Sequence, residues 1–207
     1  MKTKILILLA VIAVLLSSCY RAREIRLTEA QMQIIPYRKG QVVSFIFGAG
    51  QAVDLTVTER VTGWLHNQPD DTSIEAKRVV LKSELNCLVV NINLWADGVL
   101  MIRAILYNSL YERVTFHHIS IGREGNFLNG GWNTFGSSSI FFHENLKINN
   151  NLYFDVVEIN RVVDADGMPE IPGRPETQVI PIQLFYNKTY GILQINRDGR
   201  NFLTINH

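Results

Sequence analysis

The sequence predicts an all-β fold, a single antiparallel sandwich or barrel-like domain with one short helix near its N-terminus. Apolar and polar residues alternate over most of the chain after residue 41, which is the period of a half-buried strand. Turn-forming residues divide this pattern into about ten or eleven strands, spaced roughly eight to twelve residues apart. Neither an internal repeat nor a break in composition divides the chain into two domains.

The helix is expected first in the chain. Thr28 and Gln31 have the spacing of a capping box, in which each side chain satisfies a backbone N–H of the other residue. Pro36 disfavours helical backbone at Ile35, so the helix should end before it. The apolar residues around this turn, Leu27 among them, are expected to cover one end of the sheet.

Glycine, asparagine and aspartate mark the turns between the strands. Asp198–Gly199 lies between two alternating segments and is the strongest hairpin signal, and Ala96–Gly98 and Asn149–Asn151 are expected to turn as well. Pro181 indicates a strand at an edge or at a bulge, because proline has no N–H for the ladder. The expected strands cover 42–47, 53–57, 79–81, 85–94, 99–107, 114–121, 140–142, 152–159, 179–185, 190–195 and 202–205.

The first residues have the layout of a secretory signal. Lys2 and Lys4 precede an apolar segment at 5–16, and small residues follow it. This segment is shorter than the roughly twenty residues that a membrane-spanning helix needs, so the sequence predicts cleavage rather than a permanent span.

Leu16–Cys19 resembles the lipobox of bacterial lipoproteins, in which a branched apolar residue and two small ones precede a cysteine. The resemblance implies cleavage after Ser18 and lipid attachment at Cys19, which anchors the chain without spanning the membrane. The expected organisation is a cleaved signal peptide at 1–18, a lipid-anchored tether at 19–26 and a β-domain at 27–207.

Three further segments resemble uncharacterised small lipoproteins of Bacteroidota: Leu27–Glu29, Pro36–Gln41 and Tyr186–Leu193. This resemblance implies a location and no reaction. Tyr20–Arg23 lacks the acidic residues that follow the cysteine in surface-exported relatives, and Tyr20 replaces the aspartate that retains some lipoproteins in the inner membrane. The expected location is therefore the outer membrane, facing the periplasm.

The charge balance bears on the choice of partner. The chain has 20 Lys and Arg against 19 Asp and Glu, interspersed along its length. No basic stripe for a phosphate backbone is evident, so we do not expect nucleic acid as a partner. Once Cys19 is acylated only Cys87 remains, and it is expected to be a small buried apolar residue rather than a catalytic thiol.

Motifs for catalysis or metal binding are weak. His117 and His118 are neighbours on an expected strand and point to opposite faces, as do His143 and Glu144. A site that combines His117, His143 and Glu144 is conceivable in space, but their spacing does not require it. Asp164–Gly167 fits a turn better than a calcium loop. The expectation is no metal, no cofactor and no catalytic residues.

Residues 126–142 form the most unusual segment, because large aromatic residues alternate with glycine and serine there. Trp132 and Phe135 are the candidate ligand-binding residues, suited to stacking on sugar rings or to lining an apolar pocket. The alternative is that these rings fold back over the sheet, which is also the expectation for Trp64 and Trp95.

The predicted function is therefore a non-enzymatic, lipid-anchored envelope module that binds an apolar molecule, a glycan or an envelope protein. A structural envelope lipoprotein is the alternative, and a hydrolase is a weaker one.

Overall fold

The computed structural model describes residues 23–48, 50–67, 72–84, 87–107, 112–128, 138–164 and 179–206. Within these ranges the chain forms one helical turn, α2 (Glu29–Met32), and twelve strands. The strands are β1 (Arg23–Ile25), β2 (Val42–Phe47), β3 (Gln51–Asn67), β4 (Thr72–Lys82), β5 (Leu88–Trp95), β6 (Val99–Leu106), β7 (Glu112–Ser120), β8 (Ser138–Ile148), β9 (Asn151–Asp164), β10 (Val179–Asn187), β11 (Gly191–Arg197) and β12 (Arg200–Ile205).

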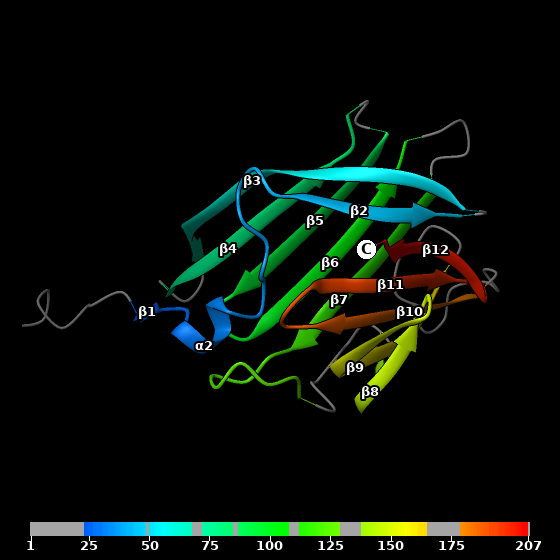
Figure 1. Ribbon diagram of the computed structural model, residues 1–207. Helices are drawn as coiled ribbons and strands as arrows, with labels where there is room; N and C mark the ends of the chain where they lie inside the picture. The colour runs from blue at the N-terminus through cyan, green and yellow to red at the C-terminus, as the bar shows by residue number, and fades with distance from the viewer. Residues whose placement is uncertain are drawn as a thin grey trace, which may run out of the picture.

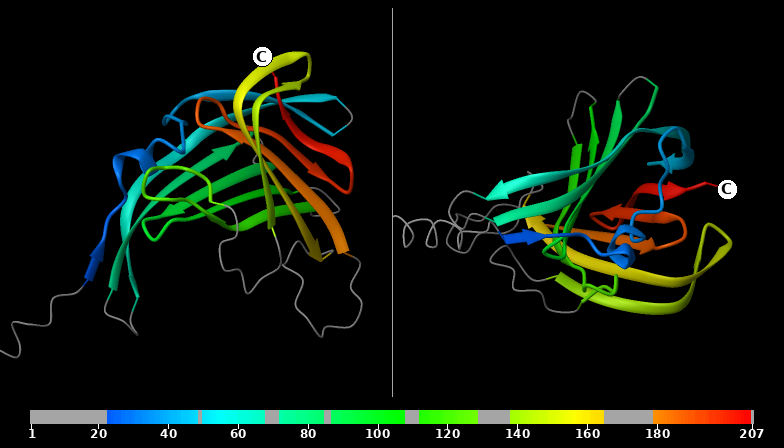
Figure 2. Two further views of the ribbon diagram at one scale, coloured as in Figure 1. Left: turned by 90° about the horizontal axis from the view of Figure 1, so that it is seen from below. Right: turned by 90° about the vertical axis from the view of Figure 1, so that its left-hand side faces the viewer.

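All these strands belong to one curled sheet, which has the shape of a half-barrel (Figures 1 and 2). Its order is β7-β6-β5-β4-β3-β2-β12-β11-β10-β9-β8, antiparallel throughout, and short β1 adds in parallel to β4. The sheet consists of two meanders, β2–β7 and β8–β12, which the pairing of β12 with β2 joins. The predicted all-β antiparallel fold is confirmed, and the single sheet decides between sandwich and barrel in favour of an open barrel.

Two hairpin turns show why asparagine and aspartate stand where they do. Asn149 and Asn150 have φ of 47° and 65°, and Asp198 and Gly199 have φ of 53° and 69°. Two successive residues with positive φ make a type I′ turn, whose twist matches that of the strands on either side. Both turns were predicted from these residues, and both are confirmed.

The concave face of the sheet carries the core. Alternate residues of β2–β6 and β9–β12 point inward and are buried, among them Phe45, Leu55, Ile92 and Leu184. Fully burying a large aliphatic or aromatic side chain contributes roughly 1.5–3 kcal/mol, so this shared face is the main stabilising element.

Residues 27–37, here called the strap, cross the inside of the half-barrel. The capping box is formed, because Thr28 Oγ1 accepts from Gln31 N–H and Gln31 Oε1 accepts from Thr28 N–H, both at 3.1 Å. Only one helical turn follows, after which Ile34 and Tyr37 enter the core. The strap, which includes α2, thus fills one end of the barrel (Figure 1).

Polar contacts fix the strap to both meanders. Tyr37 Oη accepts a 2.7 Å hydrogen bond from the Ile192 N–H of β11, and Tyr186 of β10 donates to the Ile34 carbonyl. On the opposite wall, Lys77 Nζ of β4 donates to the carbonyls of Met32 at 2.6 Å and Ile35 at 3.2 Å. The strap therefore bridges strands that are distant in the sheet order.

Pro181 does not place its strand at an edge, because β10 pairs with both β9 and β11. There is a bulge in β10, but it lies between Phe185 and Tyr186. Pairing with β11 begins only at Ile182, so Pro181 lies beyond the last rung and its missing N–H removes no ladder bond on that side.

Two further expectations about single side chains are wrong. Trp64 is 47% exposed, since pairing of β2 with β3 ends at Thr56 and the β3–β4 hairpin extends past its neighbour. The Arg26 guanidinium lies 5.6 Å from the centre of the Trp64 ring, in a cation–π contact. Cys87 is half-buried in a bend before β5, where its sulfur lies 3.2 Å from Ser83 Oγ.

Candidate functional site

The residues that sequence analysis selected for ligand and lipid, namely Trp132, Phe135 and Cys19, lie outside the described residues. The same holds for the side chains of His117 and His118. Both ends of the aromatic segment 126–142 are described, however. They converge on a hollow beside the edge strand β8.

This hollow, here called the β8–β9 groove, has a volume of about 580 Å³. Four stretches of chain line it, at 126–127, 142–144, 154–157 and 187–189. They come from the segment after β7, from β8, from β9 and from the β10–β11 turn. A volume of this size lies within the usual range of small-molecule sites, roughly 300–1,000 Å³.

A kink in β9 shapes the groove. Asp155 has a φ of 52° within the strand, a left-handed conformation that non-glycine residues rarely adopt. The kink breaks the inside–outside alternation, so that Phe154 and Asp155 are both exposed, whereas Val156 and Val157 are both buried. Aspartate tolerates left-handed backbone better than most residues with a Cβ, and unusual backbone of this kind is concentrated at functional sites.

Two phenyl rings stand exposed at the groove. Phe142 of β8 is 58% exposed and Phe154 of β9 is 62% exposed. Phe127 also lines the groove but is buried, and it makes an edge-on contact with Tyr186, at 5.8 Å between ring centres. The buried ring connects the groove with the core, while the exposed rings offer apolar faces to a ligand.

Asn187 fastens the β10–β11 turn to the kink. Its side-chain NH₂ donates to the Phe154 carbonyl at 3.3 Å, and its side-chain oxygen accepts from the Tyr190 N–H at 2.8 Å. Asn187 is buried, whereas Lys188 and Thr189 beside it are exposed at the groove. The wall of the groove is therefore rigid at Asn187 and presents polar side chains to solvent.

Two carboxylates also line the groove. His143 pairs with Val156 and Asn145 with Phe154, which places Glu144 opposite Asp155 in the β8–β9 register. Both acids are exposed. The groove thus offers hydrogen-bond acceptors at Glu144 and Asp155, a cationic donor at Lys188, and exposed phenyl rings.

A polar network leads away from the groove across the sheet. His143 Nε2 lies 2.7 Å from Glu158 Oε2, and Asn160 and Gln183 donate to Glu158 Oε1 at 2.7 and 2.8 Å. Burial raises the pKa of Glu158, but the hydrogen bonds from Asn160, His143 and Gln183 outweigh it, and the net pKa lies below the ordinary value of 4.5. Hydrogen bonds therefore hold the Glu158 carboxylate in position, and Glu158 in turn fixes His143 in place.

The network continues through amides alone. Asn196 donates to Gln183 at 2.7 Å, and Gln194 donates to Asn196 at 2.6 Å.

Within the described part of the chain, no group of three or more His, Cys, Asp and Glu side chains is placed to hold a metal ion.

Only part of this site was predictable from the sequence. Phe142 lies at the end of the aromatic segment 126–142, and His143 and Glu144 were expected to be weak metal ligands at most. The segment Tyr186–Leu193 supplies Asn187 and one wall of the groove. Phe154 was missed, because nothing in the local sequence signals the kink that exposes it.

No family model matches the sequence, and neither the curated proteins nor the solved structures contain a match. Among the described residues, the structure has no helix with the length and apolar character needed to cross a bilayer.

Proposed function

We propose that this protein is a lipid-anchored, non-enzymatic binding module of the cell envelope, and that the β8–β9 groove binds a saccharide. The observation that carries the proposal is the pair of exposed phenyl rings, Phe142 and Phe154, beside a groove with polar walls. Large rings are usually buried, and rings exposed together at a hollow are typical of binding surfaces.

The mixture of groups favours a saccharide over a purely apolar ligand. A sugar ring has apolar C–H faces that pack on aromatic rings and hydroxyls that need donors and acceptors. Glu144 and Asp155 supply acceptors, and Lys188 supplies donors. An apolar carrier would instead use the barrel interior. The strap crosses that interior, and hydrogen bonds of Tyr37 and Tyr186 hold the strap in place there.

The proposed location is the periplasmic face of the outer membrane, with Cys19 as the site of lipid attachment. It rests on the lipobox-like Leu16–Cys19 and on the residues after the cysteine. Arg23 begins β1 four positions after Cys19, and four residues span at most about 14 Å. A Cys19→Ser variant is expected to lose incorporation of labelled fatty acid; unchanged labelling would contradict the anchor.

A saccharide array tests the binding proposal. The full chain, held in a detergent without a sugar headgroup, is expected to bind a subset of envelope glycans. Phe142→Ala and Phe154→Ala should each weaken this binding about tenfold or more, because central aromatic residues dominate binding sites. Phe141→Ala is the matched control, since Phe141 is 49% exposed and neighbours Phe142 but does not line the groove.

Two results would contradict the saccharide proposal. One is the absence of binding to any glycan by the folded protein. The other is equal binding by wild type and both groove variants, which would place the sugar elsewhere.

A protein segment is the second candidate ligand. β8 is the last strand in the order of the described sheet, and strands at sheet ends can receive an added strand from a partner. Such a partner would need the backbone of β8, so Asn145→Pro should abolish its binding. Saccharide binding needs the side chains of the groove and should depend mainly on Phe142 and Phe154.

A further inference from the structure

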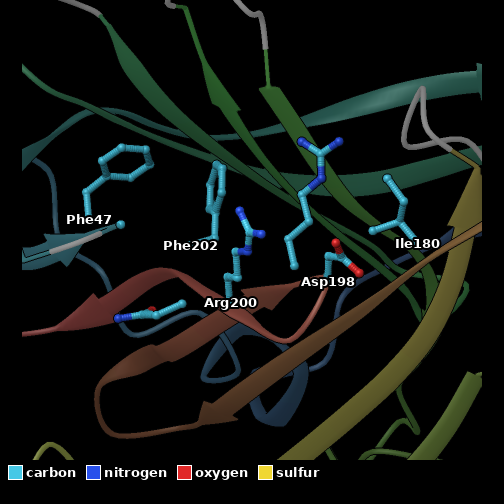
Figure 3. Close-up of a pocket in the computed structure, with 8 residues that line it drawn as sticks. Phe47, Ile180, Asp198, Arg200 and Phe202 are labelled. Atoms are coloured by element: carbon cyan, nitrogen blue, oxygen red, sulfur yellow. The ribbon is translucent and has the colours of Figure 1, made fainter.

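A second hollow, of about 490 Å³, lies at the β11–β12 turn (Figure 3). It is formed where β2 ends, β10 begins and the β11–β12 hairpin turns, and shares no lining residue with the β8–β9 groove. The strap lies beside Gly191, at the start of β11, whereas this hairpin turn follows the other end of β11.

One wall of this hollow is apolar. Phe47 and Phe202 meet edge to face, with ring centres 5.5 Å apart and an interplanar angle of 82°. The Gly48 N–H donates to the Phe202 carbonyl at 3.4 Å, which ties the end of β2 to β12 behind these rings. Ile180 lies across the cavity from them (Figure 3). These side chains make a preformed surface for an apolar group.

The other side is cationic, and the geometry of the turn makes it so. The type I′ turn at Asp198 and Gly199 places Arg197 directly opposite Arg200 on the neighbouring strand. Residues opposite each other in a ladder share a face, with Cβ atoms roughly 4.5–5.5 Å apart. Both arginines line the cavity. This side of the cavity therefore carries two cationic side chains.

Arg200 is the residue best placed to receive an anion. Its side chain is exposed and has neither a hydrogen bond nor an ion pair with any described residue. Figure 3 shows its guanidinium group toward the Phe202 side of the cavity. A planar guanidinium presents paired N–H donors that match a carboxylate or a phosphate.

Asp198 limits where the anion binds. Its N–H donates to the Pro181 carbonyl at 2.8 Å, which fixes the turn against β10. Its carboxylate lies toward Ile180, away from the Arg200 guanidinium (Figure 3). The anionic group therefore belongs beside Arg200 and Phe202.

We propose that this hollow binds a small amphiphilic anion, a phosphate or carboxylate with an attached aromatic or alkyl group. The anionic group pairs with Arg200, and the apolar group packs on Phe47 and Phe202. Because the lining differs from that of the β8–β9 groove, this proposal does not depend on the saccharide proposal.

The same chemistry could come from a free solute or from a lipid headgroup, and the structure favours the solute. The described chain begins at β1, at the opposite end of the molecule from the β11–β12 turn (Figure 1). A chain anchored before β1 therefore holds the cavity away from its own point of attachment.

The experiment is an NMR titration of the isotope-labelled full chain in a neutral detergent, with phenyl phosphate as the probe. Phenyl phosphate is expected to shift the amides of Phe47, Gly48 and Arg200–Phe202 in a saturable way. Inorganic phosphate and benzyl alcohol each lack one half of the ligand, and should bind at least tenfold more weakly.

Arg200→Gln should weaken phenyl phosphate binding about tenfold. Because Arg200 is exposed, the variant is expected to fold as wild type does. Arg38→Gln removes an exposed arginine elsewhere and should leave binding unchanged. The proposal is overturned if these amides show no saturable shift, or if Arg200→Gln binds as wild type does. It is also overturned if phosphatidylglycerol vesicles bind through Arg200 while phenyl phosphate does not, since the ligand would then be a membrane headgroup.

Discussion

Tyr37→Phe tests how the strap is held inside the barrel. The substitution removes only the hydroxyl that accepts the hydrogen bond from the Ile192 N–H, and leaves the ring and its packing in place. Tyr37 and Ile192 are both fully buried, so water cannot replace the lost acceptor. The backbone N–H of Ile192 would then be buried without a partner.

The expected cost follows from that N–H. An unsatisfied buried donor costs about 1–3 kcal/mol, whereas the loss of an exposed hydroxyl costs almost nothing. We expect Tyr37→Phe to lower the free energy of unfolding by about 2 kcal/mol. For a domain of this size that corresponds to a fall in Tm of roughly 4–8 °C.

Urea and thermal unfolding of wild type and variant measure this difference, and amide exchange at Ile192 should become faster in the variant. A Tyr37→Phe variant within about 0.5 kcal/mol of wild type, with unchanged exchange at Ile192, would refute the role given to this hydroxyl.

Three further predictions concern the same core and the polar network. Gly191→Ala should destabilise the fold by about 2–4 kcal/mol, because φ is 81° and a Cβ there overlaps the Tyr37 hydroxyl. Gly199→Ala should cost only about 1 kcal/mol, since nothing lies within 4 Å of its Cβ position. Equal Tm shifts for the two variants would contradict this. Burial, with a smaller contribution from Arg60, lowers the pKa of Lys77 from 10.5 to about 8, so between these pH values the unfolded state binds more protons than the folded state. In urea titrations, the stability of wild type relative to Lys77→Met should therefore rise from about pH 8 to pH 10.5. A difference that does not change with pH would count against a buried amine. Because the pKa of Glu158 is lowered in the folded state, the stability that Glu158 contributes is present above its ordinary pKa of 4.5 and is lost as the pH falls through the native pKa. Glu158→Gln should remove this loss of stability in acid. An unchanged acid transition would argue against the network.

Local features were predictable from the sequence because local energies decide them. Asp198–Gly199 and Asn149–Asn150 form type I′ turns since these residues tolerate positive φ. The capping box at Thr28 likewise needs only residues three apart. The half-barrel itself was not predictable in the same way. It depends on pairing of β12 with β2, strands at opposite ends of the described chain, and no local pattern encodes that register.

The β8–β9 groove was less predictable than the fold. It brings together four segments whose proximity depends on the whole sheet. The exposure of Phe154 depends on left-handed backbone at Asp155, which has no signature in an otherwise regular strand pattern. The contact of His143 with Glu158 likewise requires the β8–β9 register. The residue types were visible in the sequence, but their shared location was not.

The most direct measurement is NMR mapping of a saccharide that the array identifies, titrated into the isotope-labelled full chain in a detergent without sugar. The saccharide proposal predicts saturable shifts at residues 142–144, 154–157 and 187–189, reduced about tenfold or more in affinity by Phe154→Ala and unchanged by Phe141→Ala. Shifts confined to other parts of the sheet, or equal affinity for all three proteins, would contradict the assignment of the β8–β9 groove as the binding site.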